Sequence, residues 1–240
     1  MNKGKVDEFK LYSQQLQEEL NILVYFPPEY TPFHEYPICI AQDGKDYFQL
    51  GRIARTLDEL NYNLEIEPFL FFGIPYQSVT DRRKKYHPDG SKHKQYLLFL
   101  TNEFLPFVEK TFPVQKNAFS RALAGDSLAG TASLMGALYS PKIFGKAILH
   151  SPLVDDIVLQ NVQQFSEWEL LNIYHVIGKQ ETEVKMTDGK IADFLTSNRK
   201  LHERLKGTMA TYFYDEIEGN HTWKYWQKDL KRAFKKLFPL

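Results

Sequence analysis

The chain of 240 residues has almost no cysteine. The single thiol, Cys39, cannot form an internal disulfide, which fits a reducing compartment. It stands within the apolar run Pro37-Ile38-Cys39-Ile40-Ala41, a pattern typical of a buried strand. A reactive thiol needs an exposed, electropositive setting, so we do not expect Cys39 to be a nucleophile.

The sequence also lacks an excess of charge of one sign. Lys plus Arg and Asp plus Glu both number 30, so the formal net charge is zero. A nucleic-acid-binding protein needs a basic excess to neutralise phosphates, and we therefore expect no nucleic-acid partner. The local cluster Arg82-Arg83-Lys84-Lys85 is interpreted as part of a solvated loop.

Long hydrophobic runs are missing too. No stretch reaches the roughly 18 to 20 apolar residues of a membrane span, and the N-terminus has no apolar signal-peptide region. We expect a cytoplasmic protein without a membrane partner. The seven histidines show neither H-x-x-x-H nor Cys/His spacing, so neither a zinc site nor a cofactor is expected.

What the sequence contains is an alternation of short apolar runs and amphipathic segments. This alternation predicts an α/β fold, a mostly parallel, doubly wound sheet covered by helices on both faces, in a single domain over residues 1–240. No long insertion indicates a large lid. The predicted strands are 6–13, 20–27, 36–42, 64–74, 118–125, 146–152, 170–178 and 210–217; the predicted helices are 50–60, 96–112, 130–140, 190–206 and 223–238; 76–93 is a predicted polar loop.

Small residues surround a serine at Gly125-Asp126-Ser127-Leu128-Ala129-Gly130, between a predicted strand and a predicted helix. A nucleophile elbow, G-x-S-x-G, needs small neighbours because the turn is sharp, and Ala129 replaces the last glycine of that pattern. At such an elbow the backbone N–H of Leu128 points to a developing oxyanion. The alternative is that Ser127 only caps the helix.

The letters GDSL at 125–128 also suggest the GDSL hydrolases. In that family the motif lies near the N-terminus, and a D-x-x-H near the C-terminus supplies the acid and the base. Here the motif is in mid-chain and no D-x-x-H precedes the last predicted helix, so this assignment is disfavoured.

A serine nucleophile needs a base, and in α/β hydrolases the chain order is serine, acid, histidine. His221 follows the last predicted strand, and Gly219-Asn220 can turn the chain back toward Ser127. His150 comes too early in the chain, and His175 lies within an apolar strand, where a structural role is expected.

The acid should follow the strand 170–178. Glu181 stands three residues after its end and is the favoured candidate; Asp188 is the rival, although it precedes Gly189 like a helix cap. Less favoured carboxylates are Asp193, Asp155 and Asp156. The second oxyanion amide should come from the turn after strand 36–42, where the N–H of Gly44 or Lys45 is the expected donor.

Several residues are candidates for substrate contact, although packing is at least as good an explanation for the aromatic ones. Those near the expected catalytic turns are Tyr47, Phe48, Trp223 and Trp226, and those in the predicted loop are Asp81, Arg82 and Tyr86. The loop residues suit a polar or anionic substrate. Without a large lid, an open cleft suits a small soluble ester better than a long-chain lipid.

Four segments, "YPICIAQDGKDYF", "AGDSLAGTASL", "VIGKQETEV" and "EGNHTWKYW", resemble those of the "putative esterase" family of α/β hydrolases (esterase D and enterochelin esterase-like) over about residues 6–235. This resemblance implies an α/β-hydrolase fold, with Ser127 as nucleophile, Glu181 as acid and His221 as base. Members of the family cleave siderophore lactones, S-formylglutathione, feruloyl and acetyl sugar esters, or transfer acyl groups.

The resemblance therefore implies a serine carboxylic-ester hydrolase that acts on a small-molecule ester through an acyl-enzyme, without a cofactor. The alternatives are a thioesterase, resembling S-formylglutathione hydrolase, an acyltransferase on the same fold, and a non-catalytic binding protein. An exposed edge strand of the predicted sheet leaves a homodimer open.

Overall fold

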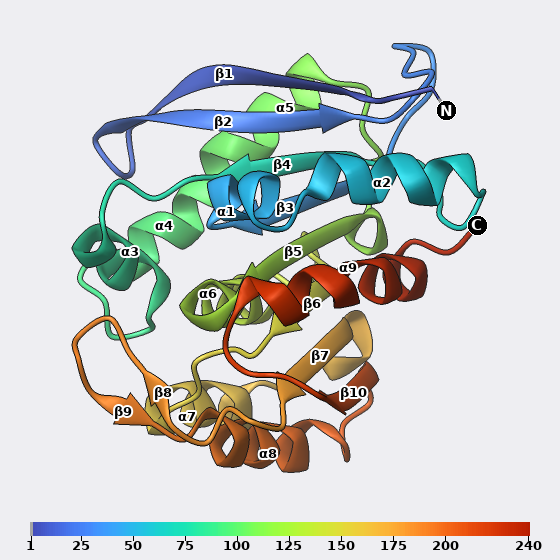
Figure 1. Cartoon of the computed structure of the whole chain (residues 1–240). Coiled ribbons are helices and arrows are strands. Elements are labelled where there is room, and N and C mark those ends of the chain that lie inside the picture. The colour runs from blue at the N-terminus through green and yellow to red at the C-terminus, as the bar shows by residue number, and fades with distance from the viewer. Residues whose placement is uncertain (1) are drawn as a thin grey trace.

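The computed structural model describes residues 2–240 and is built on an eight-stranded sheet (Figure 1). The strand order is β1-β2-β4-β3-β5-β6-β7-β10. Strands β1 and β2 pair antiparallel, β2 also pairs antiparallel with β4, and the remaining neighbours are parallel. The strands are β1 (Lys5–Ser13), β2 (Glu18–Phe26), β3 (Ile38–Gln42), β4 (Leu70–Ile74), β5 (Arg121–Asp126), β6 (Lys146–His150), β7 (Asn172–Gly178) and β10 (Thr211–Ile217).

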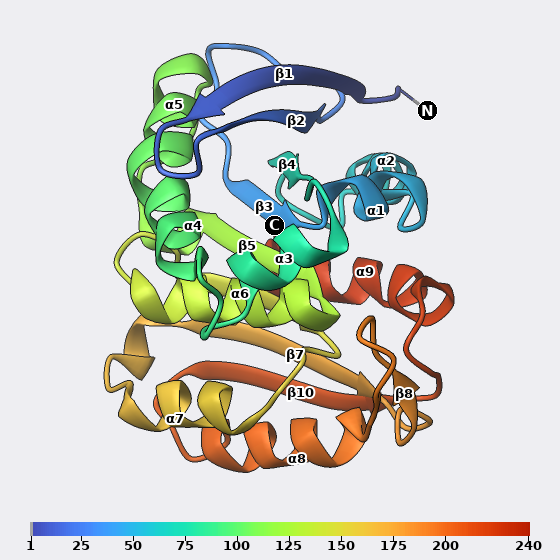
Figure 2. The same cartoon turned by 90° about the vertical axis from the view of Figure 1, so that its left-hand side faces the viewer.

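Helices cover both faces of the sheet, as Figure 2 shows. One face carries α1 (Gly44–Gln49), α2 (Ile53–Tyr62) and α9 (Trp223–Leu237), and the other carries α4 (His93–Phe99), α5 (Leu105–Thr111), α6 (Ser127–Tyr139), α7 (Asp156–Gln164) and α8 (Phe194–Leu205). The central strands β3, β4 and β5 are buried along their whole length. Their continuous apolar runs follow from this two-sided burial, and the predicted doubly wound fold is confirmed.

Alternate residues of one strand pack into opposite layers. On β3, Ile38 and Ile40 join the core beneath α4, α5 and α6, whereas Cys39 and Ala41 join the core beneath α1, α2 and α9. This is the period-two geometry of a strand. Cys39 is fully buried, and burial raises the pKa of its thiol, so the thiolate needed for nucleophilic chemistry is disfavoured.

The predicted polar loop 76–93 is wrong in part, because it contains helix α3 (Val79–Tyr86). Ser78 caps this helix, since its hydroxyl accepts a hydrogen bond from the N–H of Asp81 at 3.1 Å. The basic cluster is not simply a solvated loop either, because Lys85 is buried and pairs with Glu18 and Asp81. The buried residues of this helix are one ion-paired lysine, Lys85, and one aromatic residue, Tyr86, so the sequence shows no apolar periodicity there.

Further segments differ from the prediction. Helices α1 and α7 were not predicted, and the predicted strand 64–74 is a strand only over Leu70–Ile74. A small hairpin, β8 (Val184–Lys185) and β9 (Ile191–Ala192), precedes α8. The predicted helix 96–112 is present as α4 and α5, joined by a π-helical turn at Leu100–Phe104. Pro106 stands in the first turn after this change, where the missing N–H of proline is best tolerated.

The parallel strands bring distant parts of the chain to one edge of the sheet. In the register of β3 and β5, Ala41 lies opposite Ala124, so the turns that follow these strands are neighbours. In the register of β7 and β10, Gly178 lies opposite Ile217, so the segments that contain Glu181 and His221 leave the sheet side by side. This edge of the sheet, at the carboxyl ends of the strands, is where open α/β sheets place their ligand sites.

Candidate active site

Ser127 stands on a sharp turn between β5 and α6. Its backbone has φ = 52°, in the left-handed region that serine rarely adopts. A Cβ atom at Gly125 would lie 2.2 Å from the carbonyl carbon and oxygen of Ala129, so only glycine fits where the strand and the helix approach. The N-cap position of α6 belongs to Asp126 rather than Ser127, which leaves the serine hydroxyl free for another partner.

That partner is His221, which lies between β10 and α9. Its Nε2 is 2.9 Å from the Oγ of Ser127, although 94 positions separate the two residues. The rings of Phe194 and Trp226 lie 4.4 and 4.9 Å from the imidazole, centroid to centroid. These aromatic neighbours fix the plane of the ring while one edge of it reaches the serine.

Glu181 lies on the other side of the imidazole and continues the hydrogen bonding that begins at Ser127. Its Oε2 is 2.5 Å from the Nδ1 of His221, and the carboxylate is fully buried. The rival candidate, Asp188, is exposed in the turn of the β8–β9 hairpin, where its carboxylate accepts a hydrogen bond from the N–H of Lys190. The structure thus brings Glu181, and not Asp188, to the histidine.

Two residues behind Glu181 have a role that the sequence did not suggest. The hydroxyl of Ser151 donates to Oε1 of Glu181 at 2.6 Å and accepts a hydrogen bond from the indole N–H of Trp226 at 3.0 Å. The N–H of Gly178 also donates to Oε1, at 2.9 Å. Ser151 follows β6 at the carboxyl edge of the sheet, a position that could have marked it as a site residue.

The expected oxyanion donors lie on the neighbouring turns after β3 and β5. Leu128 stands in the first turn of α6, and Gly44 and Lys45 open α1. Neither helix has a side-chain hydrogen bond at its N-cap. Because the first N–H groups of a helix have no partner within the helix, these amides are suited to receive an anion.

The structure gives the expected substrate-contact residues different surroundings. Tyr47, Tyr86 and Trp226 are buried among protein groups, so direct substrate contact by their side chains is not supported. Phe48 and Trp223 are half-buried and remain candidates. The two charged residues of α3, Asp81 and Arg82, are paired within the protein, with Lys85 and Asp43 respectively.

The remaining buried histidines are held by structural contacts. His175 accepts from the hydroxyl of Tyr212 and donates to Asn198, at 2.9 and 2.8 Å, which confirms its expected place in the core. His150 lies 3.0 Å from the carboxylate of Asp229. Between the carboxylates of Asp89 and Asp155 lies His87, which belongs to the predicted polar loop and is buried.

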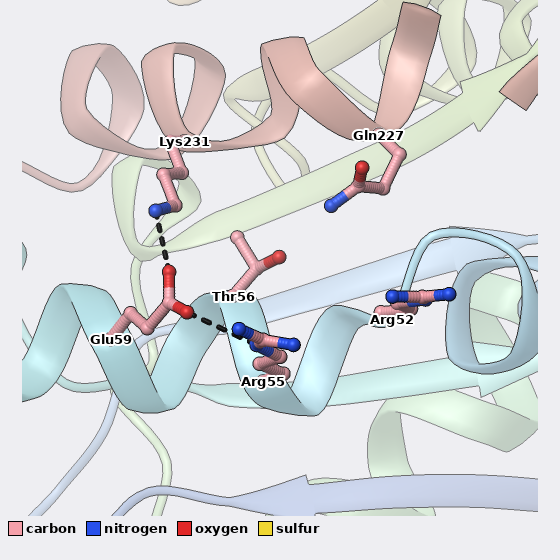
Figure 3. A pocket seen from close by; sticks show the side chains of 6 residues that line it. All are labelled: Arg52, Arg55, Thr56, Glu59, Gln227 and Lys231. Atoms are coloured by element: carbon pink, nitrogen blue, oxygen red, sulfur yellow. Dashed lines mark hydrogen bonds and ion pairs between the residues drawn. The ribbon is translucent and has the colours of Figure 1, made fainter. Parts of the chain in front are cut away.

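A separate polar pocket of about 280 Å³ lies between α2 and α9 (Figure 3). The carboxylate of Glu59 bridges Arg55 and Lys231 across it. Its lining includes none of Ser127, His221 and Glu181; the residues are Arg52, Arg55, Thr56, Glu59, Gln227 and Lys231. This pocket is distinct from the serine site.

Within residues 2–240, no group of three or more His, Cys, Asp or Glu side chains is arranged to hold a metal ion. The same part of the chain has no helix long and apolar enough to cross a membrane.

A serine on a strand–turn–helix elbow of a doubly wound sheet, hydrogen-bonded to a histidine after the last strand, defines the α/β-hydrolase class of proteins. The profile of the Esterase family, described as "Putative esterase", matches residues 13–237. The chain belongs to this family and is an esterase.

Three individual proteins are similar to this chain over nearly its whole length. The uncharacterized protein YjcH of Bacillus subtilis is 44% identical, with 98% of each chain covered. An acetyl esterase of Caldicellulosiruptor saccharolyticus is 22% identical, covering 95% of this chain and 96% of its own. The crystal structure of an enterochelin esterase from Shigella flexneri superimposes with a TM-score of 0.83 at 20% identity, covering 97% of this chain and 57% of that one, and shows the shared fold.

Proposed function

We propose that Ser127, His221 and Glu181 form a catalytic triad that hydrolyses a small carboxylic ester through an acyl-enzyme. The observation that carries this proposal is the continuous series of hydrogen bonds from Ser127 Oγ through both ring nitrogens of His221 to the buried carboxylate of Glu181. A carboxylate on Nδ1 keeps the proton on that nitrogen, so Nε2 is free to accept the proton of the serine.

In the acylation half-reaction, Nε2 of His221 takes the hydroxyl proton as Ser127 Oγ bonds to the ester carbonyl carbon. The carbonyl oxygen becomes an oxyanion, which the N–H groups of Leu128 and Lys45, or of Gly44, stabilise. The tetrahedral intermediate then expels the alcohol, whose oxygen takes the proton from His221, and the acyl group stays on Ser127. Glu181 stabilises the imidazolium that forms in between.

In the deacylation half-reaction, His221 removes a proton from water, and the hydroxide oxygen bonds to the acyl carbon. A second oxyanion forms at the same amides and collapses, breaking the bond to Ser127 Oγ. The serine recovers its proton from His221, and the carboxylic acid leaves. No cofactor takes part in the proposed reaction.

The proposed substrate is a small soluble ester, such as a siderophore lactone, a sugar ester or a short-acyl ester. The acetyl esterase and enterochelin esterase relatives support this range. The connection from β6 to β7 carries only α7 and a single 3-10 turn at Trp168–Leu170, so the fold has no large lid to shelter a long lipid chain. Half-buried Phe48 and Trp223 are the proposed aromatic contacts for the substrate.

The proposed triad can be tested without knowing the substrate. We expect a fluorophosphonate to label the purified protein stoichiometrically at Ser127, as located by peptide mass mapping, and the label to vanish in Ser127→Ala. In His221→Ala the labelling rate should fall sharply. The controls are Ser91→Ala and His34→Ala, which alter exposed residues outside the site. An unlabelled but folded wild-type protein would indicate a hydrolase fold kept for binding.

Initial rates on nitrophenyl esters of increasing acyl length test the substrate class. We expect the highest kcat/KM with short acyl chains, and a preference for C12 or longer would contradict the proposal. Parallel assays on thioesters, and on esters with an added alcohol acceptor, separate the esterase from a thioesterase and from an acyltransferase.

A further inference from the structure

Helix α3 holds the turn that carries the proposed oxyanion amides of Gly44 and Lys45. Asp43, the residue before these amides, receives two kinds of contact from α3. Its carboxylate Oδ2 accepts from Nε and Nη2 of Arg82, at 2.7 and 2.6 Å. Its backbone N–H donates to the hydroxyl of Tyr86 at 3.2 Å. Both the side chain and the main chain of Asp43 are therefore fixed by one helix.

The backbone of Asp43 needs this support. Its φ of 56° lies in the left-handed region, which costs an ordinary residue free energy unless its surroundings hold it there. A Cβ atom on the next residue, Gly44, would lie 2.2 Å from the backbone of Gly73. The turn is therefore tightly packed against β4 on one side, and Arg82 secures Asp43 by its side chain.

Arg82 is itself held in place. Its guanidinium carbon lies 5.7 Å from the ring centroid of Tyr76 and 5.7 Å from that of Tyr86. Its side chain is only 12% exposed. A guanidinium that lies over two aromatic rings and is bonded to one carboxylate through two nitrogens has a defined orientation, which a lysine ammonium in its place would not have.

Arg82 also opposes the effect of burial on the carboxyl group of Asp43. Burial and the carboxylate of Asp43 raise the pKa of neighbouring Asp126 well above its ordinary value. Burial also raises the pKa of Asp43, but the charge of Arg82 opposes that shift. The guanidinium of Arg82 thus offsets the burial of the carboxylate that directly precedes the proposed oxyanion amides.

We propose that Arg82 is a positioning residue that, through Asp43, orients the amides of Gly44 and Lys45 toward the oxyanion. This inference deepens the proposed function and rests on it. The sequence suggested that Arg82 contacts a polar or anionic substrate, whereas in the structure its Nε and Nη2 bind Asp43 and its side chain is 12% exposed. Arg82 acts on the transition state, where the oxyanion carries charge, rather than on substrate binding.

The first experiment compares Arg82→Ala with Arg83→Ala on a short-chain nitrophenyl ester. Arg83 is the matched control, because it is next in sequence, half-exposed and, among residues 2–240, paired only with Asp89. We expect kcat of Arg82→Ala to fall by on the order of 10- to 1000-fold with little change in KM, as for the loss of an oxyanion donor. Arg83→Ala should keep wild-type kcat. An unchanged kcat in folded Arg82→Ala, or a rise in KM alone, would overturn the inference.

Chemical rescue separates positioning from general loss of structure. Added guanidinium ion at millimolar concentration should raise kcat of Arg82→Ala several-fold, because it can occupy the vacated place beside Asp43. It should not raise kcat of Asp43→Asn, which has no carboxylate to bind it. Equal response of both variants, or of neither, would contradict the assigned role.

If Arg82→Ala does not fold, Arg82→Lys is the variant to measure. We expect a lower kcat at constant KM, and a parallel loss of affinity for a trifluoromethyl ketone, whose serine adduct carries an oxyanion. Wild-type kcat and affinity in this variant would refute the inference. Fluorophosphonate labelling of wild-type Ser127 keeps the two proposals apart. Its absence defeats the triad, whereas normal labelling with unimpaired Arg82 variants defeats only the role of Arg82.

Discussion

Nδ1 of His221 lies 2.5 Å from the carboxylate of Glu181, and that carboxylate is completely buried. A buried carboxylate must have its hydrogen-bonding capacity satisfied, and Glu181 meets this need with His221 on one oxygen and Ser151 and Gly178 on the other. Every contact of the acid therefore helps to fix the direction in which the histidine faces Ser127. The first two predictions concern this arrangement.

Glu181→Gln should lower kcat by on the order of 1000- to 10,000-fold while the protein stays folded. A glutamine can place its amide N–H against Nδ1, which moves the imidazole proton to Nε2 and prevents that nitrogen from accepting the serine proton. Ester hydrolysis and circular dichroism measure the two effects. Asp188→Asn, which alters the exposed rival carboxylate, should retain full activity. A loss of activity in Asp188→Asn but not in Glu181→Gln would show that the acid of the triad is Asp188, in the hairpin.

Ser151→Ala should destabilise the protein and reduce activity less than Glu181→Gln does. It removes one donor to Glu181 and leaves the indole N–H of Trp226 without its acceptor, at a cost of about 1–3 kcal/mol in the free energy of unfolding. Urea unfolding and kcat measure both effects. Trp226→Phe should reproduce part of the activity loss. Normal kcat in both variants would show that His221 and the N–H of Gly178 are enough to orient Glu181.

The elbow should tolerate a change at Ala129 and not at Gly125. Gly125→Ala places a Cβ atom against the Ala129 backbone and should abolish both stable folding and activity. Ala129→Gly, which restores the strict elbow pattern, should keep kcat within a few-fold and lower stability by about 1–2 kcal/mol through helix propensity and a lost buried methyl. Thermal unfolding and hydrolysis assays test the pair. Equal tolerance at both positions would contradict the close approach seen here.

Stability should fall as the pH falls from about 6.5 to about 4, because of His175. Burial lowers the pKa of this histidine from its ordinary value of 6.5 to about 4, so in that range the unfolded chain binds a proton that the folded protein excludes. The free energy of unfolding then decreases as the pH falls, by up to about 3 kcal/mol from this group. The contribution of neutral His175 to the free energy of unfolding is fully present above pH 6.5.

His175→Gln provides the comparison for this pH dependence. The free energy of unfolding, measured in urea between pH 4 and 7, should depend less steeply on pH in the variant. The difference corresponds to up to one proton taken up on unfolding. Identical slopes for the variant and the wild-type protein would assign the dependence to other groups, such as His93, whose pKa burial also lowers.

The order of strands and helices was accessible from the sequence, because each central strand is a short apolar run and each major helix has an apolar face. Helix α3 was not accessible in this way. Its inward face carries Arg82 and Lys85, which pair with Asp43 and Glu18 from distant segments, and no local pattern reveals these two partners. Charged residues in a row resemble a solvated loop until the rest of the fold supplies the opposite charges.

The residues of the candidate site were also predictable from sequence only in part. Ser127 and His221 were recognisable from sequence because a sharp elbow demands small residues around the serine and because the base follows the last strand. The choice between Glu181 and Asp188, the support that Ser151 and Trp226 give to the acid, and the burial of Tyr47 and Tyr86 were decided by tertiary structure. Local sequence determines backbone conformation and periodicity, whereas side chains from distant segments acquire partners only when the parallel sheet brings the ends of its strands together.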